Sequence, residues 1–372
     1  MPSFRAGTVA RVLESRAGLQ RVLVVLENGT EHAEPERAYV LTKLTGPVGA
    51  GDRVIVNTTA VELGLGTGGW HVVHWNLERD EWHEPGPGHV LKVRYTSLQT
   101  DVGSAEEHEP GLADVESIEG MPVVAAGLHS QLPAIAVALK VARPDLRVAY
   151  VMTDGAGLPI AVSDLVAALT TRKLIDLTIT SGHAFGGDYE AVSVYSALAI
   201  ARHVAHADVA IVVMGPGITG TETLLGFSGI ELGSVLDAVT GLGGLPIACL
   251  RASLADLRER HRGVSHHSLT ALTTACRSRV LVALPAVGGA AEARLRADLE
   301  GAGIDTRHEI VAVVAPDVLE LFAKHNLDVL SMGRPAAVDP ILFQAAAAAG
   351  TLAAQRVTTR ASSTAAAPRG TA

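Results

Sequence analysis

The chain has 372 residues, a formal net charge of −9 and 48% hydrophobic side chains, of which few are aromatic. The length allows two domains, and the hydrophobic content predicts a folded chain and excludes a wholly disordered one. The acidic balance argues against a nucleic-acid-binding function, because phosphate contacts need clustered lysine and arginine, and we expect no basic run.

The N-terminal segment MPSFRAGTVARV has no basic stretch followed by an apolar run, so we expect no signal peptide. The hydrophobic windows are interrupted before they reach the roughly 20 apolar residues that cross a bilayer. Cys249 and Cys276 lie in apolar segments, which predicts buried thiols and neither a disulfide framework nor a cysteine zinc site. We therefore expect a cytoplasmic protein of bacterial type.

Residues 1–99 predict a small β-barrel of OB or SH3-like type, because branched residues alternate or cluster between turn residues such as Asn28-Gly29. All three tryptophans fall in this region. Such barrels often bind oligonucleotides, but the first 115 residues carry 10 basic and 16 acidic side chains. A packing or docking role is therefore favoured, and nucleic acid is not an expected partner.

Residues 100–120 are acidic and poor in apolar side chains, which is typical of an interdomain linker. From 121 to 355, apolar runs alternate with helical segments, as in a doubly wound, mostly parallel, Rossmann-like α/β domain. Residues 356–372 have no apolar periodicity and predict a disordered tail. The seven predicted strands lie within residues 121–127, 147–155, 174–182, 208–217, 245–251, 279–285 and 309–315.

Ligands of such sheets bind outside the carboxyl ends of the strands, so the loops that follow the strands are the candidate sites. His129 follows the first predicted strand, where it could hold an anion or act as an acid or base. Asp154 follows the second strand, where it could be a metal ligand or a base, or only close an Asx turn.

The segment SGHAFGGDYE follows the third predicted strand and precedes an apolar helix predicted from residue 189. Asp188 fits an N-cap, and Glu190 fits the first helical turn, where the helix dipole favours a negative charge. Capping does not require His183, so His183 is the first catalytic candidate of this segment.

The loop after the fourth strand contains Gly215, Gly217 and Gly220 in a G-x-G-x-x-G pattern. A dinucleotide site would also need an acid at the end of the next strand, where this chain has Arg251. A glycine-rich loop that presents backbone N–H groups to an anion, with Thr219 and Thr221, is the favoured interpretation, and NAD(P) binding is an alternative.

His266 and His267 precede a helix that Ser265 caps, and His267 is a further catalytic candidate. Adjacent residues do not share a helix face, so a metal site would use at most one of the two histidines. The metal-ligand candidates, which together offer nitrogen and oxygen atoms, are Asp154, His183, Asp188 and His266. No strict metal-binding spacing is present, and no particular cofactor is predicted.

Five segments, GDRVIVNTTAVELGLGTGGWHVVHWNL, VMTDGAGLPIAVSDLV, SGHAFGGDYEAVSVYSALA, MGPGITGTETLLGFSGIE and RGVSHHSLTAL, resemble the domain-of-unknown-function 3866 family of bacterial proteins. The resemblance covers nearly the whole chain up to the tail. It implies one complete two-part unit, and it brings no activity, cofactor or catalytic residue to this chain.

The favoured function is binding of a small anionic or nucleotide-like ligand at the strand-carboxyl edge, with acid–base or metal-assisted chemistry as an extension. One alternative is a non-catalytic regulatory or assembly protein, with a docking barrel and a homo-oligomer interface of apolar helices. The other alternative is an NAD(P)-dependent oxidoreductase.

Overall fold

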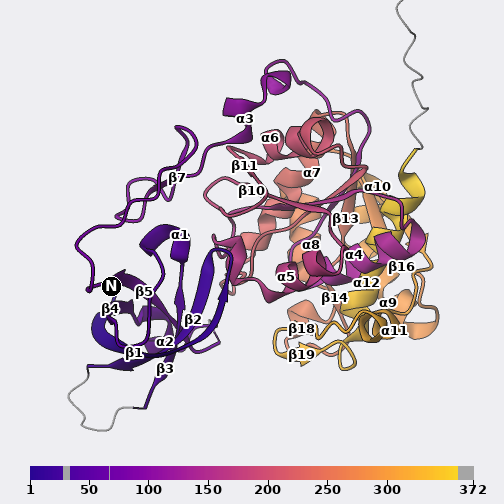
Figure 1. Cartoon of the computed structure of the whole chain (residues 1–372). Helices are drawn as coiled ribbons and strands as arrows, with labels where there is room; N and C mark the ends of the chain where they lie inside the picture. Colours follow the sequence, from indigo (N-terminus) through magenta and orange to yellow (C-terminus); the bar gives the residue numbers. More distant parts are fainter. Residues whose placement is uncertain (28–33, 67, 359–372) are drawn as a thin grey trace, which may run out of the picture.

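The computed structural model describes residues 1–27, 34–66 and 68–358. It contains a closed barrel followed by an eight-stranded sheet with helices on both faces, which confirms the predicted fold class (Figure 1). The Asn28-Gly29 pair and most of the predicted tail lie outside the described residues. Among the described residues, no helix is both long and apolar enough to span a membrane.

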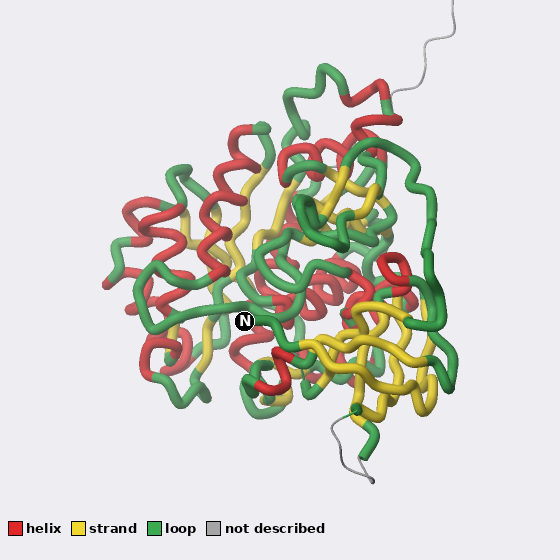
Figure 2. The backbone as a smooth tube through the Cα atoms, turned by 90° about the vertical axis from the view of Figure 1, so that its left-hand side faces the viewer, coloured by secondary structure: helices red, strands yellow, loops and turns green. Residues whose placement is uncertain are grey.

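The barrel closes because β1 is long and bends through two register shifts, so that it pairs with β2 along one part and with β4 along another. Valine side chains from all five strands fill its interior. Figure 2 shows the barrel strands as a group beside the larger α/β part. In the order in which they pair, the strands are β1 (Phe4–Arg16), β2 (Leu19–Leu26), β3 (Glu36–Val40), β5 (Trp70–Asn76) and β4 (Arg53–Asn57), with short helices α1 (Thr42–Thr45) and α2 (Thr59–Glu62) in the connections.

The large sheet is parallel, and five of its eight strands are buried along their whole length, as coverage of both faces by helices requires. It holds the seven predicted strands and one more, β11, which the sequence did not predict. In spatial order the strands are β11 (Tyr189–Ala191), β10 (Leu177–Ser181), β9 (Val148–Met152), β12 (Val209–Val212), β8 (Pro122–Ala125), β13 (Leu245–Cys249), β16 (Leu281–Pro285) and β17 (Glu309–Val313).

Each face of the sheet carries its own group of helices and its own core cluster. One face is covered by α4 (Leu132–Ala142), α5 (Asp164–Thr171), α11 (Val318–Lys324) and α12 (Pro340–Arg356). The other face is covered by α6 (Val194–Ala199), α7 (Glu231–Gly241), α8 (His266–Thr270), α9 (Gly289–Gly301) and α10 (Ile304–Arg307).

The strand order creates two crevices at the carboxyl edge of the sheet. The connections that leave β8 and β9 run toward the β11 edge, whereas those that leave β12 and β13 run toward the β17 edge. Connections therefore diverge between β9 and β12 and again between β8 and β13. Such switch points are where open α/β sheets bind ligands.

Residues between the barrel and the sheet run along the β10–β11 edge, with hairpin β6 (Leu91–Lys92) and β7 (Thr100–Asp101) and helix α3 (Ala105–His108) (Figure 1). The barrel also contacts α5 directly. Arg16 and Arg21 both form ion pairs with Asp164 at 2.7 Å.

Candidate functional site

The segment that follows β10 contacts the residues that connect the barrel to the sheet in the structure, 77–121, which we call the linker from here on. The Nδ1 atom of His183 accepts a hydrogen bond of 3.0 Å from the backbone N–H of Val93, and a guanidinium nitrogen of Arg94 lies 3.3 Å from its Nε2. A neutral imidazole accepts through one nitrogen only, so the shorter contact assigns the acceptor to Nδ1 and the proton to Nε2. Linker atoms therefore surround the His183 ring in this conformation.

The two acids of this segment do not cap a helix, and that expectation is wrong. The helix begins at Val194 with Ser193 as its N-cap, because Tyr189–Ala191 pairs with β10 as strand β11. Asp188 accepts hydrogen bonds from the N–H and hydroxyl of Thr178. It therefore stabilises the turn between these two strands.

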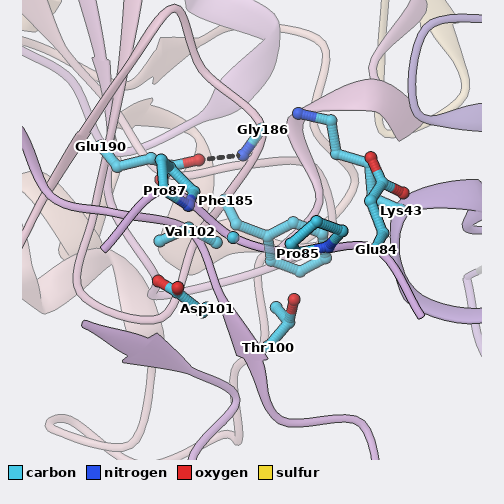
Figure 3. A pocket seen from close by; sticks show the side chains of 11 residues that line it. Lys43, Glu84, Pro85, Pro87, Thr100, Asp101, Val102, Phe185, Gly186 and Glu190 are labelled. Carbon is cyan, nitrogen blue, oxygen red and sulfur yellow. Dashed lines mark hydrogen bonds between the residues drawn. The ribbon is translucent and has the colours of Figure 1, made fainter. Parts of the chain in front are cut away.

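Glu190 instead pairs with a lysine that is 1% exposed. Lys92 donates to Glu190 at 2.7 Å and to the carbonyls of Thr180 and Ala184 at 3.0 and 2.5 Å, which uses all three of its protons. Glu190 also accepts from the N–H of Gly186 at the wall of a cavity of about 180 Å3 between the linker and this loop (Figure 3). All three protons of the Lys92 ammonium group are used, so Lys92 attaches the linker firmly to the edge of the sheet.

His129 is buried and joins three loops. Its Nδ1 lies 3.0 Å from the Met214 carbonyl, which can only accept, so Nδ1 carries the proton. Its Nε2 then accepts from the Ser163 hydroxyl at 2.7 Å, and Ser163 also caps α5 by accepting from Val166 N–H. Burial lowers the pKa of His129 to about 4, so the ring is neutral near pH 7 and stabilises the three loops through its two hydrogen bonds.

The crevice between β9 and β12 contains two acids. Asp154 accepts from the backbone N–H of His183 at 2.9 Å, and Glu231, the first residue of α7, accepts from the Thr153 hydroxyl at 2.5 Å. Burial, with a smaller contribution from the charge of Asp154, raises the pKa of Glu231 to about 7. Sequence reasoning did not identify Glu231, since a glutamate in a first helical turn is common.

A cavity of about 370 Å3 opens between this crevice and the barrel. Its walls are mostly apolar, and the stacked rings of Tyr39 and Trp70, 4.6 Å apart, form one side. Pro159, Val162 and Pro216 of the α/β part form the other side. The guanidinium groups of Arg21 and Arg37 lie 5.3 and 5.1 Å from the centre of the Trp70 ring, so this ring already has cationic partners within the barrel.

The loop after β12 does not build a dinucleotide fingerprint. Gly220 pairs with Phe227 in an isolated bridge, and Thr221 is tied to Gly226 by two hydrogen bonds. Helix α7 begins only at Glu231, so these glycines do not open a helix as that motif requires. The loop instead presents Thr219, Gly220 and Thr221 to a third cavity.

This third cavity, about 130 Å3, lies beside the crevice between β8 and β13. We call it the arginine–histidine pocket. The loop after β13 supplies most of its polar wall, held in place by the hairpin of β14 (Ala252–Ser253) and β15 (Gly263–Val264). The lining residues are Ile218, Thr219, Gly220, Thr221, Arg251, Arg258, Arg260, His261, His267 and Met332, and none of them is acidic.

The arginines of the pocket differ in how far their charge is neutralised. Arg258 is paired with Asp256 at 3.0 Å. Arg260 lies 3.6 Å from the carboxylate of Glu222, which is strongly exposed. Arg251 is 6% exposed, and in the described part of the chain no carboxylate lies within ion-pair distance of it. Its guanidinium instead contacts Nδ1 of His267 at 3.0 Å.

The contact with Arg251 determines which nitrogen of His267 carries the proton. A guanidinium only donates, so Nδ1 of His267 must accept, and the proton of the neutral ring lies on Nε2. Burial and the nearby arginine charges lower the pKa of His267, and that of His261, to about 3. Burial also lowers the pKa of Arg251, to about 10, and it stays charged at neutral pH. The pocket therefore combines charged guanidinium donors with neutral imidazoles.

His261, His266 and His267 also form a possible metal-binding group, with one nitrogen of each lying within 4.8 Å of the others. The expectation that at most one of the adjacent histidines could take part is wrong. At the start of α8 the two rings converge, with centroids 4.4 Å apart, and His261 joins them from the preceding loop. The Nε2 of His266 is buried and has no hydrogen-bond partner in the part of the chain that the structure describes.

The structure thus brings part of the predicted set together. Thr219, Gly220, Thr221 and His267 share the pocket, and His266 lies beside it, whereas His129, Asp154 and His183 belong to other contacts. Sequence reasoning missed the arginines and His261. The signal was RERHR at 258–262, and the expectation that the chain lacks a basic run is wrong.

The fold and this site define a two-part protein: a β-barrel, and a doubly wound α/β domain with an arginine–histidine pocket at its strand-carboxyl edge. A family model described as "Protein of unknown function (DUF3866)" matches residues 37–350, so the chain belongs to that family. No curated protein and no solved structure matches the chain.

Proposed function

We propose that the chain binds a small anion, a phosphate or carboxylate group, in the arginine–histidine pocket. The observation that carries this proposal is the Arg251 guanidinium, which is buried and has no carboxylate partner among the described residues. Asp256 and Asp339 act on Arg251 only from beyond ion-pair distance, since they pair with Arg258 and Arg334. A buried charge without a direct ion-pair partner is costly, and a bound anion supplies that partner. Guanidinium groups are the preferred partners of phosphate and carboxylate oxygens.

The neighbouring groups support the same ligand class. The Nε2–H of His267 is a donor, and the Thr219 hydroxyl can donate, whereas the Thr221 hydroxyl already donates to the Gly226 carbonyl. Arg260 has a buried Nε without a hydrogen-bond partner among the described residues. No lining acid opposes an anion, although the whole chain carries a net charge of −9. Local charge at the pocket is therefore opposite to the charge of the chain.

The test is calorimetric titration of the full chain with inorganic phosphate and with acetate, using Arg260→Gln and the control Arg262→Gln. Arg260 lines the pocket, whereas Arg262 is exposed and has only a long contact with Glu259. Because a charge-assisted hydrogen bond contributes roughly 1.5–3 kcal/mol, we expect Arg260→Gln to weaken binding about tenfold or more. The control should stay within about twofold of the parent. The proposal is refuted if Arg260→Gln leaves the affinity for both anions unchanged, or if neither anion binds to the parent chain.

A second candidate function is metal binding by the three histidines, which rests on the convergence of their nitrogen atoms. The surrounding guanidinium charges oppose a lone cation, and the Arg251 contact leaves a proton on Nε2 of His267. A metal ion would therefore bind best together with an anion. Zinc titration with and without phosphate tests this, with His266→Ala expected to abolish metal binding and to leave phosphate binding in place.

A further inference from the structure

We infer that the anion bound in the arginine–histidine pocket is the head of an amphiphile, a phosphate or carboxylate that carries an apolar chain. This inference rests on the proposed function and adds the ligand class to it. The first reason is size. A cavity of about 130 Å3 is smaller than the roughly 300–1,000 Å3 of pockets that enclose a whole small-molecule ligand. The pocket therefore holds a head group, and the rest of a larger ligand lies over its rim.

The second reason is the chemistry of that rim. Three segments surround the pocket, and each exposes large apolar side chains: residues 221–226, residues 254–258, and the hairpin of β18 (Leu330–Ser331) and β19 (Arg334–Pro335). We define the apolar rim as Leu224, Leu225, Leu257 and Met332, which are 63%, 55%, 96% and 52% exposed.

Ion-pair contacts connect these three segments around the pocket. The Arg260–Glu222 contact joins the loop after β13 to the loop after β12, and Arg334 joins the hairpin to Asp256 at 3.1 Å. Met332 itself lines the cavity, and Leu257 immediately precedes a lining arginine. Apolar side chains thus border the polar cavity from three sides. Large apolar side chains exposed this close to a polar cavity indicate an interaction site.

The arrangement matches a ligand with two unlike parts. An anion enters the recess beside the buried guanidinium, and an apolar chain leaves it across leucine and methionine side chains, where it is removed from water. Unbranched, polarisable methionine adapts to chains of different shape. A purely polar ligand would make no use of this rim.

The experiment compares inorganic phosphate, butyl phosphate and octyl phosphate, each kept monomeric, by calorimetry on the full chain. A fully buried methylene strengthens binding about fourfold, so with half of the chain surface covered we expect about twofold per added methylene. The test variant is Leu257→Ser, which removes the most exposed leucine of the rim. Leu63→Ser is the matched control, because Leu63 is 67% exposed and lies on the barrel.

The expected result is that Leu257→Ser reduces the gain from butyl to octyl phosphate and leaves the affinity for inorganic phosphate unchanged, whereas Leu63→Ser changes neither. Equal affinities for all three phosphates overturn the amphiphile inference and leave the proposed anion site standing. If Arg260→Gln leaves the affinities for all three phosphates unchanged, both the proposed anion site and the amphiphile inference are overturned. Binding only to vesicles that contain phosphatidic acid overturns capture of a single molecule. Conversion of a dimer to a monomer by Leu257→Ser, with octyl phosphate binding unchanged, overturns the inference and assigns the rim to self-association.

Discussion

Replacing Glu231 with glutamine should stabilise the protein at alkaline pH and change it little at acidic pH. Glu231 begins α7 with its carboxyl group half-buried beside Thr153. Burial is the main cause that raises its pKa from the usual 4.5 to about 7, and the negative charge of Asp154 adds to it. The phenol of Tyr150 lies in the same field, and its pKa is raised by burial and then by Glu231.

The magnitude follows from the linkage between protonation and folding. Each pH unit between the folded and unfolded pKa corresponds to 1.36 kcal/mol, so a rise from 4.5 to about 7 gives about 3 kcal/mol as an upper limit. The carboxyl group is partly exposed, so solvent screening reduces the effect to about 1–2 kcal/mol. Because the folded pKa is the higher one, stability is complete below the unfolded pKa and is lost as pH rises toward about 7.

Glutamine keeps the carbonyl oxygen that accepts from Thr153 and never ionises. We therefore expect Glu231→Gln to raise the free energy of unfolding by about 1–2 kcal/mol near pH 8.5, and by about a quarter of that near pH 5. Urea unfolding followed by far-UV circular dichroism measures this, because the helices belong mainly to the α/β part that contains Glu231. Tryptophan fluorescence would report on other segments, since all three tryptophans precede the sheet. Glu300→Gln, an exposed change on α9, is the control. An equal effect at both pH values, or destabilisation near pH 8.5, refutes the reasoning.

Three further predictions concern packing and domain contacts. Gly350→Ala should destabilise by about 1–3 kcal/mol, because a Cβ there would lie 2.4 Å from the Ile135 carbonyl; a higher melting temperature would contradict this. Lys92→Met should cost about 3–5 kcal/mol by leaving Glu190 buried without its partner, and should expose the linker to limited proteolysis. Pairing that change with E190Q should recover part of the loss. Asp164→Ala should lower the free energy of unfolding by no more than about 1 kcal/mol, because its ion pairs are partly exposed. Small-angle scattering should nevertheless show that the barrel is less firmly attached to the α/β part, and an unchanged scattering profile would refute this.

The sequence alone determined the elements whose signal is local. Runs of four apolar residues such as those at 209–212 and 281–284 are typical of strands covered on both sides, and their alternation with helical segments predicts the parallel sheet. The barrel followed in the same way from alternating valines and turn residues. The elements without such a signal include α12, which is rich in alanine and buried almost all round, and β11, which is three residues long and follows a glycine-rich loop.

Tertiary structure decided the site. Polar loops after parallel strands were expected to share one edge of the sheet, but strand order determines which of them meet. Because β13 pairs with β8 and β12 lies on the other side of β8, the loops after β12 and β13 converge on one pocket. The linker covers His183 instead, and the buried position of Arg251 depends on the packing around it. Residue type and spacing are local properties, whereas the burial that leaves a guanidinium without a carboxylate partner exists only in the folded chain.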